Sequence, residues 1–206
     1  MNDLSTYAKL PESFYKRSKV VAVARDLLGK YLITNIDEKI TVGKIVETEA
    51  YCGRNDRACH ASKGLTKRTT TMYEAGGIAY IYLCYGVHHL FNVVTNEEGL
   101  ADAVLIRALE PVHNIEEMQR RRKNVPYTRL TAGPGTLSQA LGINTSLNGY
   151  SLTGEKIWIA EKNRQQSFVI DSDRRVGVDY AGEDALLPWR FFISGNTFVS
   201  VPKRIQ

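Results

Sequence analysis

Cysteine is scarce in this chain of 206 residues, which has three, at positions 52, 59 and 84. Their number is odd and no two have the Cys-x-x-Cys spacing. Both facts argue against a disulfide scaffold or an iron–sulfur cluster and favour a reducing compartment. Cys52, Cys59 and His60 also make a poor zinc site, because a fourth ligand is missing at any usual spacing. We therefore expect neither a metal nor another cofactor.

Long apolar runs are missing as well. No stretch approaches the ~20 residues that a membrane span requires. The first residues, Met1-Asn2-Asp3-Leu4-Ser5, have neither the basic patch nor the apolar segment of a secretory signal, so we expect a cytoplasmic location. No repeat, low-complexity segment or Pro/Gly/Ser-rich linker divides the chain. With 43% hydrophobic and 24% charged residues, one globular domain over residues 1–206 is expected, with residues 1–13 as an N-terminal arm.

Positive charge is present but unevenly placed. Residues 54–68 and residues 117–129 each contain five basic side chains and one acidic side chain, whereas the whole chain has a net charge of +5. The remainder of the chain is therefore net negative. Such clustering favours a phosphate-bearing or polyanionic partner. On charge alone, two solvated basic faces are an equally good interpretation.

The pattern of apolar residues predicts more strands than helices. Helical spacing covers Lys19–Leu28, with Gly29 as its stop, and further helices are predicted over Asn114–Lys123 and Leu137–Leu141. Because no βαβ rhythm is evident, the α+β class is favoured over a doubly wound α/β fold. The predicted strands are Lys30–Ile36, Lys39–Tyr51, Ile78–Cys84, His88–Thr95, Ala103–Leu109, Lys156–Glu161, Arg175–Val178, Arg190–Ile193 and Phe198–Val201.

Two carboxylates occur close together in the second of these strands. Side chains alternate along a strand, so Glu47, Glu49 and Tyr51 share one face, with the carboxylates ~6–7 Å apart along the backbone. Their mutual repulsion can raise the pKa of one of them and provide an acid or base near neutrality. An exposed polar strand face is the structural alternative. A carbohydrate hydrolase that uses Glu47 and Glu49 as an acid/base pair is another.

Tyrosine is concentrated beside the first basic window, since five of the eleven tyrosines lie between positions 51 and 85. Tyr80 and Tyr82 share one strand face, and Tyr85-Gly86-Val87 connects two predicted strands. Tyrosines suit strands in general, but they also stack on nucleobases. A Tyr-Gly tip suits a wedge between base pairs. From the residues alone we predict a nucleic-acid-binding α+β protein, for which a binding module without chemistry is an open alternative.

Taken in order along the chain, these motifs resemble the 3-methyladenine (alkyladenine) DNA glycosylase family of the animal type. The resemblance extends over about residues 14–202, and the Gly/Pro-rich motif of the helix-hairpin-helix glycosylases is not found. It rests on Val46-Glu-Thr-Glu-Ala-Tyr51, His60, Tyr80-Ile-Tyr-Leu-Cys-Tyr-Gly86, Asn92, Leu105-Ile-Arg-Ala-Leu-Glu-Pro111, Ala132-Gly-Pro-Gly-Thr-Leu-Ser-Gln-Ala-Leu-Gly-Ile143 and Arg175-Val-Gly-Val178.

The resemblance implies a single α+β domain with a mostly antiparallel curved sheet, flanking helices and a protruding β-hairpin that intercalates into DNA. It implies a monofunctional DNA glycosylase of base excision repair. Such an enzyme flips alkylated or deaminated purines of the 3-methyladenine, 7-methylguanine and hypoxanthine class out of duplex DNA and hydrolyses the N-glycosidic bond. The implied partner is double-stranded DNA with a damaged purine, with no membrane, and the chain is expected to act as a monomer.

Roles for individual residues also follow from the resemblance. Glu49 is the implied base that activates the attacking water, Arg107 is the arginine beside it, and Tyr85 is the intercalating residue. Glu47 is assigned no part in the chemistry. The implied base pocket consists of Tyr51, His60, Tyr82 and Asn92, and the implied DNA-backbone contacts are Thr66, Arg68, Gly133 and Gly135.

Overall fold

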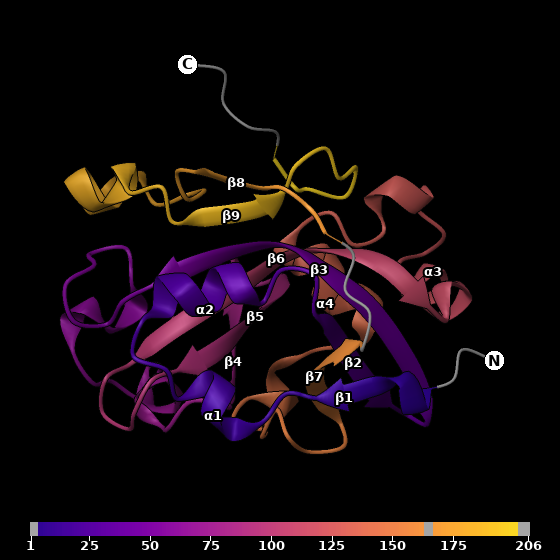
Figure 1. Cartoon of the computed structure of the whole chain (residues 1–206), viewed down its shortest axis with the longest axis horizontal. Coiled ribbons are helices and arrows are strands. Elements are labelled where there is room, and N and C mark those ends of the chain that lie inside the picture. The colour runs from indigo at the N-terminus through magenta and orange to yellow at the C-terminus, as the bar shows by residue number, and fades with distance from the viewer. Residues whose placement is uncertain (1–3, 163–166, 202–206) are drawn as a thin grey trace.

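The computed structural model describes residues 4–162 and 167–201 of the chain. The strands in these ranges form one 9-stranded sheet that curves into a half-barrel (Figure 1). The order is β1-β7-β2-β3-β6-β5-β4, β9 pairs with β3 and β8, and every pairing is antiparallel. The strands are β1 (Tyr7–Lys9), β2 (Tyr31–Ile36), β3 (Lys39–Tyr51), β4 (Ala79–Cys84), β5 (His88–Thr95), β6 (Asp102–His113), β7 (Ile157–Lys162), β8 (Ile170–Asp173) and β9 (Arg190–Ile193).

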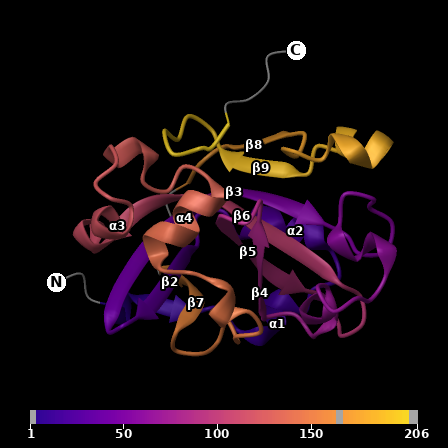
Figure 2. The same cartoon turned by 180° about the vertical axis from the view of Figure 1, so that it is seen from behind.

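Helices flank this sheet. The α-helix α2 packs against β3 and β6 on the side seen in Figure 1, and α4 packs against β5 and β6 on the side seen in Figure 2. The predicted single α+β domain with a curved antiparallel sheet is therefore confirmed. The α-helices are α1 (Glu12–Tyr15), α2 (Val20–Asp26), α3 (Ile115–Arg121) and α4 (Pro134–Leu141), and the 3-10 helices are η1 (Leu4–Thr6), η2 (His60–Lys63), η3 (Thr70–Tyr73), η4 (Tyr127–Arg129), η5 (Thr145–Leu147) and η6 (Asp179–Leu186).

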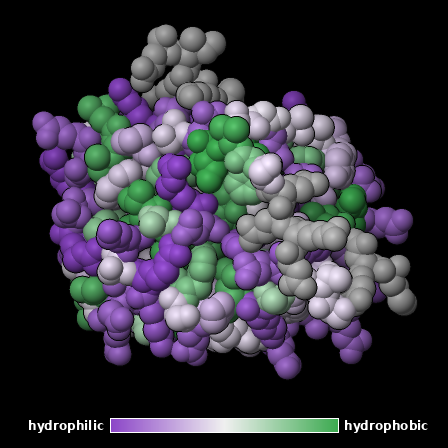
Figure 3. All heavy atoms as spheres, viewed as in Figure 1, coloured by the Kyte–Doolittle hydropathy of each residue, from purple (hydrophilic) through white to green (hydrophobic). Residues whose placement is uncertain are grey.

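The face of the molecule drawn in Figure 3 is mostly hydrophilic, with hydrophobic residues in small separate areas. Apolar side chains are instead gathered in the interior, between the sheet and its helices. Across the described ranges, none of the helices combines the length and the apolar character that a membrane crossing needs.

The long strand β3 has two different faces. On one face Val46 and Ala50 are fully buried in the main core, and the Thr48 hydroxyl donates to the carbonyl oxygen of Ala24 in α2 at 2.8 Å. The alternate residues Glu47 and Glu49 point the other way. Because β6 pairs along one edge of this part of β3 and β9 along the other, both glutamates are fully enclosed. The sheet thus places two carboxylates in its interior.

Two of the predicted strands are wrong. Residues 175–178 and 198–201 form bends and turns. Their amides bond to side chains and turn carbonyls instead of a neighbouring strand: Val176 N–H donates to Glu49, Ser200 N–H to Glu47, and Phe198 N–H to Asn196 Oδ1. The short strands β1 and β8 were not predicted. The predicted helix over Lys19–Leu28 and both predicted hairpins are confirmed.

Candidate active site

A cavity of about 720 Å³ opens between the β4–β5 hairpin, the N-terminus of α4 and the loop that precedes η6. Its wall brings together most of the residues singled out from the sequence. Thr66 lies outside the cavity, and Glu49 has no exposed surface. The predicted site residues that line it are Tyr51, His60, Arg68, Tyr82, Tyr85, Asn92, Arg107, Gly133 and Gly135.

Aromatic rings form one wall of the cavity. The rings of Tyr80 and Tyr82 are 5.5 Å apart, as their shared face on β4 predicts, and His60 meets Tyr82 edge-on with ring centroids 4.5 Å apart. The Nδ1 atom of His60 lies 3.1 Å from the Tyr80 hydroxyl. Tyr80 is not among the pocket residues predicted from the sequence, although the sequence places it on the same strand face as the pocket residue Tyr82. The wall offers π-faces on which a planar ring can stack.

The imidazole of His60 is neutral at physiological pH. Burial, and secondarily the positive charge of Arg68, lower the pKa of His60 from 6.5 to about 4. The proton would have to enter a partly desolvated site beside a cation, which disfavours the charged ring. His60 therefore presents an uncharged ring to whatever occupies the cavity.

This lowered pKa predicts a pH dependence of stability. Between pH 4 and pH 6.5 the unfolded chain binds a proton at His60 that the folded protein does not bind, so the free energy of unfolding falls as the pH is lowered through that window. One such group contributes a slope of at most ~1.4 kcal/mol per pH unit. We expect His60→Asn to have a shallower slope than the wild type in urea titrations at several pH values. Equal slopes would contradict this account of His60.

The hairpin tip projects from the cavity rim. Val87 N–H donates to the Cys84 carbonyl oxygen at 3.1 Å, and the two central residues of this turn, Tyr85 and Gly86, both have positive φ, at 51° and 70°. Turns of this kind require φ > 0 at both positions, which Gly86 adopts freely and a tyrosine adopts rarely. The Tyr85 side chain is nevertheless 92% exposed. A large aromatic ring is thus held in solvent on a strained turn.

The base of the hairpin is fixed against the rest of the cavity. Gly135 near the start of α4 packs directly on His88 of β5, and a Cβ atom at Gly135 would lie 2.8 Å from the imidazole. Glycine is therefore needed for this close approach. Further along β5, the side-chain amide of Asn92 donates to the carbonyl oxygens of Tyr80, at 3.1 Å, and Leu90, at 3.3 Å. These contacts fix the orientation of Asn92 in the wall.

The Glu49 carboxylate lies directly behind the cavity wall. Its Oε2 atom accepts from the Tyr51 hydroxyl at 2.7 Å and from Arg107 Nη1 at 3.3 Å, and its Oε1 atom accepts from the Val176 amide at 2.7 Å. All three donor residues line the cavity. The contact between Glu49 and Arg107 agrees with the prediction that they are neighbours, whereas the Val176 amide was not foreseen from the sequence.

The two side chains that donate to Oε2 are held in their donating forms. Burial, and then the adjacent Glu49 carboxylate, raise the pKa of Tyr51 well above its ordinary value, so the phenol keeps its proton. Burial opposes the charge of Arg107, but the Glu49 and Glu47 carboxylates outweigh it and raise the pKa of the guanidinium. Glu49 is therefore surrounded by donors, the set that an ionised carboxylate accepts.

Glu47 belongs to a second network behind Glu49, and Arg107 is common to both. Its Oε1 atom accepts from Arg107 Nε at 3.2 Å and from Arg190 Nη1 at 3.0 Å, and its Oε2 atom accepts from the Ser200 amide at 2.6 Å. Arg190 is 1% exposed and also pairs with Asp173 at 3.0 Å. Arg107 thus links both glutamates, which confirms that they share one face of β3. Glu47 faces protein on all sides and does not line the cavity.

Of the remaining predicted residues, Arg68 and Gly133 line the cavity and Thr66 lies outside it. Arg68 is exposed, and its guanidinium lies 5.1 Å from the centroid of the Tyr82 ring. Thr66 is exposed nearby, with its hydroxyl 3.0 Å from that of Thr69. Gly133 precedes α4, whose N-terminus has no side-chain cap. Within the described ranges, no group of three or more His, Cys, Asp or Glu side chains is arranged to hold a metal ion.

Comparison with known proteins identifies the family to which the chain belongs. A model of the methylpurine-DNA glycosylase family matches residues 13–197. The chain belongs to this family. A protein of Legionella pneumophila (strain Lens) with the name "Putative 3-methyladenine DNA glycosylase" is 47% identical over 194 residues, which cover 93% of this chain and 98% of that protein. Proteins of the same name from Natranaerobius thermophilus and Chlamydia felis are 44% and 48% identical, over 94% and 90% of this chain and 99% and 96% of their own.

Membership of the methylpurine-DNA glycosylase family confirms the resemblance found in the sequence. The chain is a DNA glycosylase for alkylated bases, that is, an enzyme of DNA repair that hydrolyses N-glycosyl bonds in DNA. The two alternatives left open by the residues, a binding module without chemistry and a carbohydrate hydrolase, are thereby set aside. The burial of Glu47 in its arginine network also argues against an acid/base pair with Glu49.

Proposed function

We propose that this glycosylase flips a damaged purine of the 3-methyladenine, 7-methylguanine and hypoxanthine class out of duplex DNA and hydrolyses its N-glycosidic bond with a water that Glu49 activates. The observation that carries the proposal is the position of the Glu49 carboxylate. It lies immediately behind an aromatic cavity, and three cavity-lining residues, Tyr51, Arg107 and Val176, donate to it. Residues 1–206 act in this proposal as one catalytic domain and as a monomer.

Entry of the base depends on the hairpin. Tyr85, 92% exposed at the tip of the turn, is suited to fill the gap in the duplex that a flipped nucleotide leaves. Damaged bases stack and pair less well, so they are extruded at a lower cost than normal bases. Phosphates on either side would be held by Thr66 and Arg68 and by the α4 N-terminus at Gly133 and Gly135, where backbone amides are free of a side-chain cap.

The flipped base would stack in the cavity on Tyr51 and Tyr82, with His60 at its edge. A purine alkylated at N3 or N7 carries a positive charge, which the electron-rich faces of the tyrosines attract. Asn92 is fixed by its bonds to Tyr80 and Leu90 at the position proposed to disfavour guanine, whose exocyclic amino group would meet it. The alkylated base then leaves as a neutral molecule. A lesion such as hypoxanthine needs protonation instead, and the neutral His60 imidazole is a poor acid for it.

Glu49 acts on the reaction at the sugar. Departure of the base generates an oxocarbenium-like sugar, which a nearby carboxylate stabilises while accepting a proton from the attacking water. Glu49 is fully buried, and the residues that stand between its carboxylate and the cavity are its own three donors. No lysine nucleophile takes part, so the product is free base and an abasic site in an uncut strand.

This proposal is tested by product analysis on a duplex with a single 3-methyladenine or hypoxanthine. The wild type is expected to release the free base from at least one of them and to leave a strand that breaks only on treatment with alkali. The same duplex with an undamaged purine is the control. Two results would contradict the proposal: binding of both lesion duplexes without base release, or strand cleavage with an enzyme–DNA adduct trapped by borohydride.

A further inference from the structure

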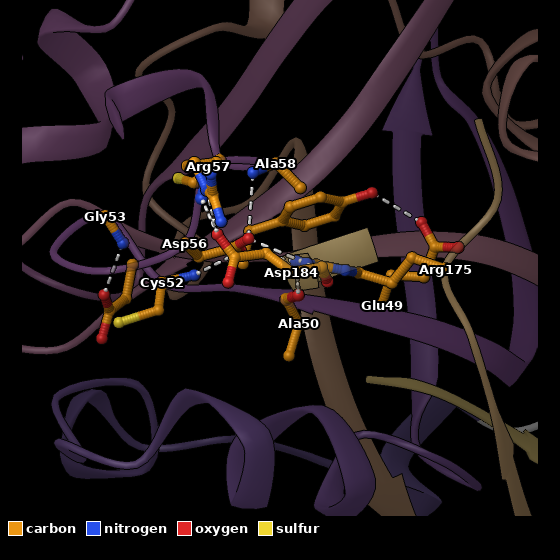
Figure 4. Close-up of polar contacts among 12 residues, drawn as sticks. Glu49, Ala50, Cys52, Gly53, Asp56, Arg57, Ala58, Arg175 and Asp184 are labelled. Atoms are coloured by element: carbon orange, nitrogen blue, oxygen red, sulfur yellow. Dashed lines mark hydrogen bonds and ion pairs between the residues drawn. The ribbon is translucent and has the colours of Figure 1, made fainter. Parts of the chain in front are cut away.

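A buried ion pair lies beside the active site. The side chains of Arg175 and Asp56 are both 0% exposed. The guanidinium makes a two-pronged contact, with Nη1 donating to Asp56 Oδ2 and Nη2 donating to Asp56 Oδ1 at 2.8 Å (Figure 4). Asp56 itself is fixed, because it accepts from the backbone amides of Cys52 at 3.2 Å and Ala58 at 3.0 Å.

The same guanidinium connects three segments that are far apart in the sequence. Nη1 also donates to the carbonyl oxygen of Ala50 in β3, and Nη2 donates to that of Asp184 in η6, both at 2.9 Å (Figure 4). The cation lies over the rings of Tyr51, at 4.8 Å, and Trp189, at 5.2 Å. Four hydrogen bonds and two ring contacts give the side chain no freedom to reorient.

Arg175 lies next to two of the three donors to Glu49. The ring of Tyr51, whose hydroxyl donates to Oε2, is covered by the Arg175 guanidinium. Val176, whose amide donates to Oε1, is the next residue in the chain and lies in a segment without regular secondary structure. Arg190 holds the preceding residue, since its Nε donates to the Arg174 carbonyl oxygen at 3.1 Å, and the side chain of Arg175 is the anchor directly next to the Val176 amide. The third donor, Arg107, comes from β6 and does not depend on this pair.

We propose that Arg175, clamped by Asp56, is a positioning residue that orients the Glu49 carboxylate through Tyr51 and the Val176 amide. The inference rests on the proposed function of Glu49. Packing alone does not call for an ion pair here, because apolar residues of similar volume often stabilise a buried site as well or better. The distinctive property of the pair is its fixed planar geometry. Lysine keeps the charge but lacks the fork, so it cannot hold Asp56, Ala50 and Asp184 together.

The test compares Arg175→Lys with wild type by two readouts. The first is the first-order rate of base release at saturating enzyme, which reports only on protein that has folded and bound. The second is the Kd for a duplex with a tetrahydrofuran abasic-site analogue, which does not depend on the chemistry. We expect the rate to fall roughly 10- to 100-fold, since small misplacements of reacting groups have effects of this size, and the Kd to stay within about twofold.

Asp26→Asn is the matched control. It makes the same aspartate-to-asparagine change in an exposed ion pair, that of Asp26 with Arg17 at 2.7 Å. Neither residue contacts Arg175 or Asp56, so its rate should equal that of the wild type. Asp56→Asn is a second variant, which disrupts the Arg175–Asp56 ion pair from the other side. Like Arg175→Lys, it should have a lower rate of base release and an almost unchanged Kd.

Wild-type rates in both Arg175→Lys and Asp56→Asn would overturn the inference. A parallel loss of rate and DNA affinity would also overturn it, because it indicates that the whole site has become less ordered. Wild type and Glu49→Gln are run alongside. No release by wild type would overturn the proposed function and this inference together. Release by wild type, loss in Glu49→Gln and an unchanged rate in Arg175→Lys and Asp56→Asn would overturn the inference alone.

Discussion

Replacing Glu49 with glutamine is expected to lower the single-turnover rate of base release by ~10³-fold, within the range that a positioned general base contributes. The substitution keeps the shape of the side chain and leaves an oxygen that can still accept from one neighbour. It removes the negative charge that faces the developing oxocarbenium ion and the site that takes the proton from water. Binding should persist, because the cavity wall and the hairpin are unchanged.

Rates for this variant are best measured on a duplex with one damaged purine, alongside Glu110→Gln. Glu110 is a half-buried glutamate in β6 whose Oε2 accepts from the Asn196 side chain at 2.9 Å, so the control has a comparable change of charge in the same sheet. We expect the control to release base at the wild-type rate. A Glu49→Gln rate within a few-fold of wild type would remove Glu49 from the mechanism.

Replacing Glu47 with alanine is expected to have the largest effect on stability, about 3–5 kcal/mol, the usual cost of removing one partner of a buried ion pair. Glu47 is the shared acceptor of the buried Arg107 and Arg190 side chains and of the half-buried Ser200 amide, and its loss removes an acceptor from all three. Urea unfolding should show this as a lower midpoint. The surface variant Glu12→Ala, which breaks an exposed contact with Lys16, should leave the urea midpoint close to that of the wild type. A similarly small effect at Glu47 would contradict the network's role.

Local pattern was sufficient to predict the strands that carry the site. Alternation along Lys39–Tyr51 placed Glu47 and Glu49 on one face, and Arg107 does contact both. Alternation also placed Tyr80 and Tyr82 on one face of the hairpin, where their rings meet. These predictions succeed because the period of a strand is fixed by its backbone geometry, whatever the tertiary context.

Contacts between distant segments could not be read in the same way. Arg175 and Asp56 are 119 residues apart, and neither stands in a local pattern that points to the other. The apolar residues around Arg175 suggested a strand, whereas its side chain and the Val176 amide are committed to Asp56 and Glu49. The full burial of Glu49 also depends on the pairing of β9 with the far edge of β3. No feature of residues 39–51 indicates that pairing.

In the proposed mechanism the Glu49 carboxylate stands against the reacting sugar at the side of the aromatic cavity. This position is tested most directly by affinity for two otherwise identical duplexes, one with a cationic pyrrolidine in place of the sugar and one with the neutral tetrahydrofuran. We expect wild type to bind the pyrrolidine duplex at least ~10-fold more tightly, as a mimic of the transition state should bind, and Glu49→Gln to lose this preference. An equal preference in both proteins would show that the carboxylate does not face the sugar.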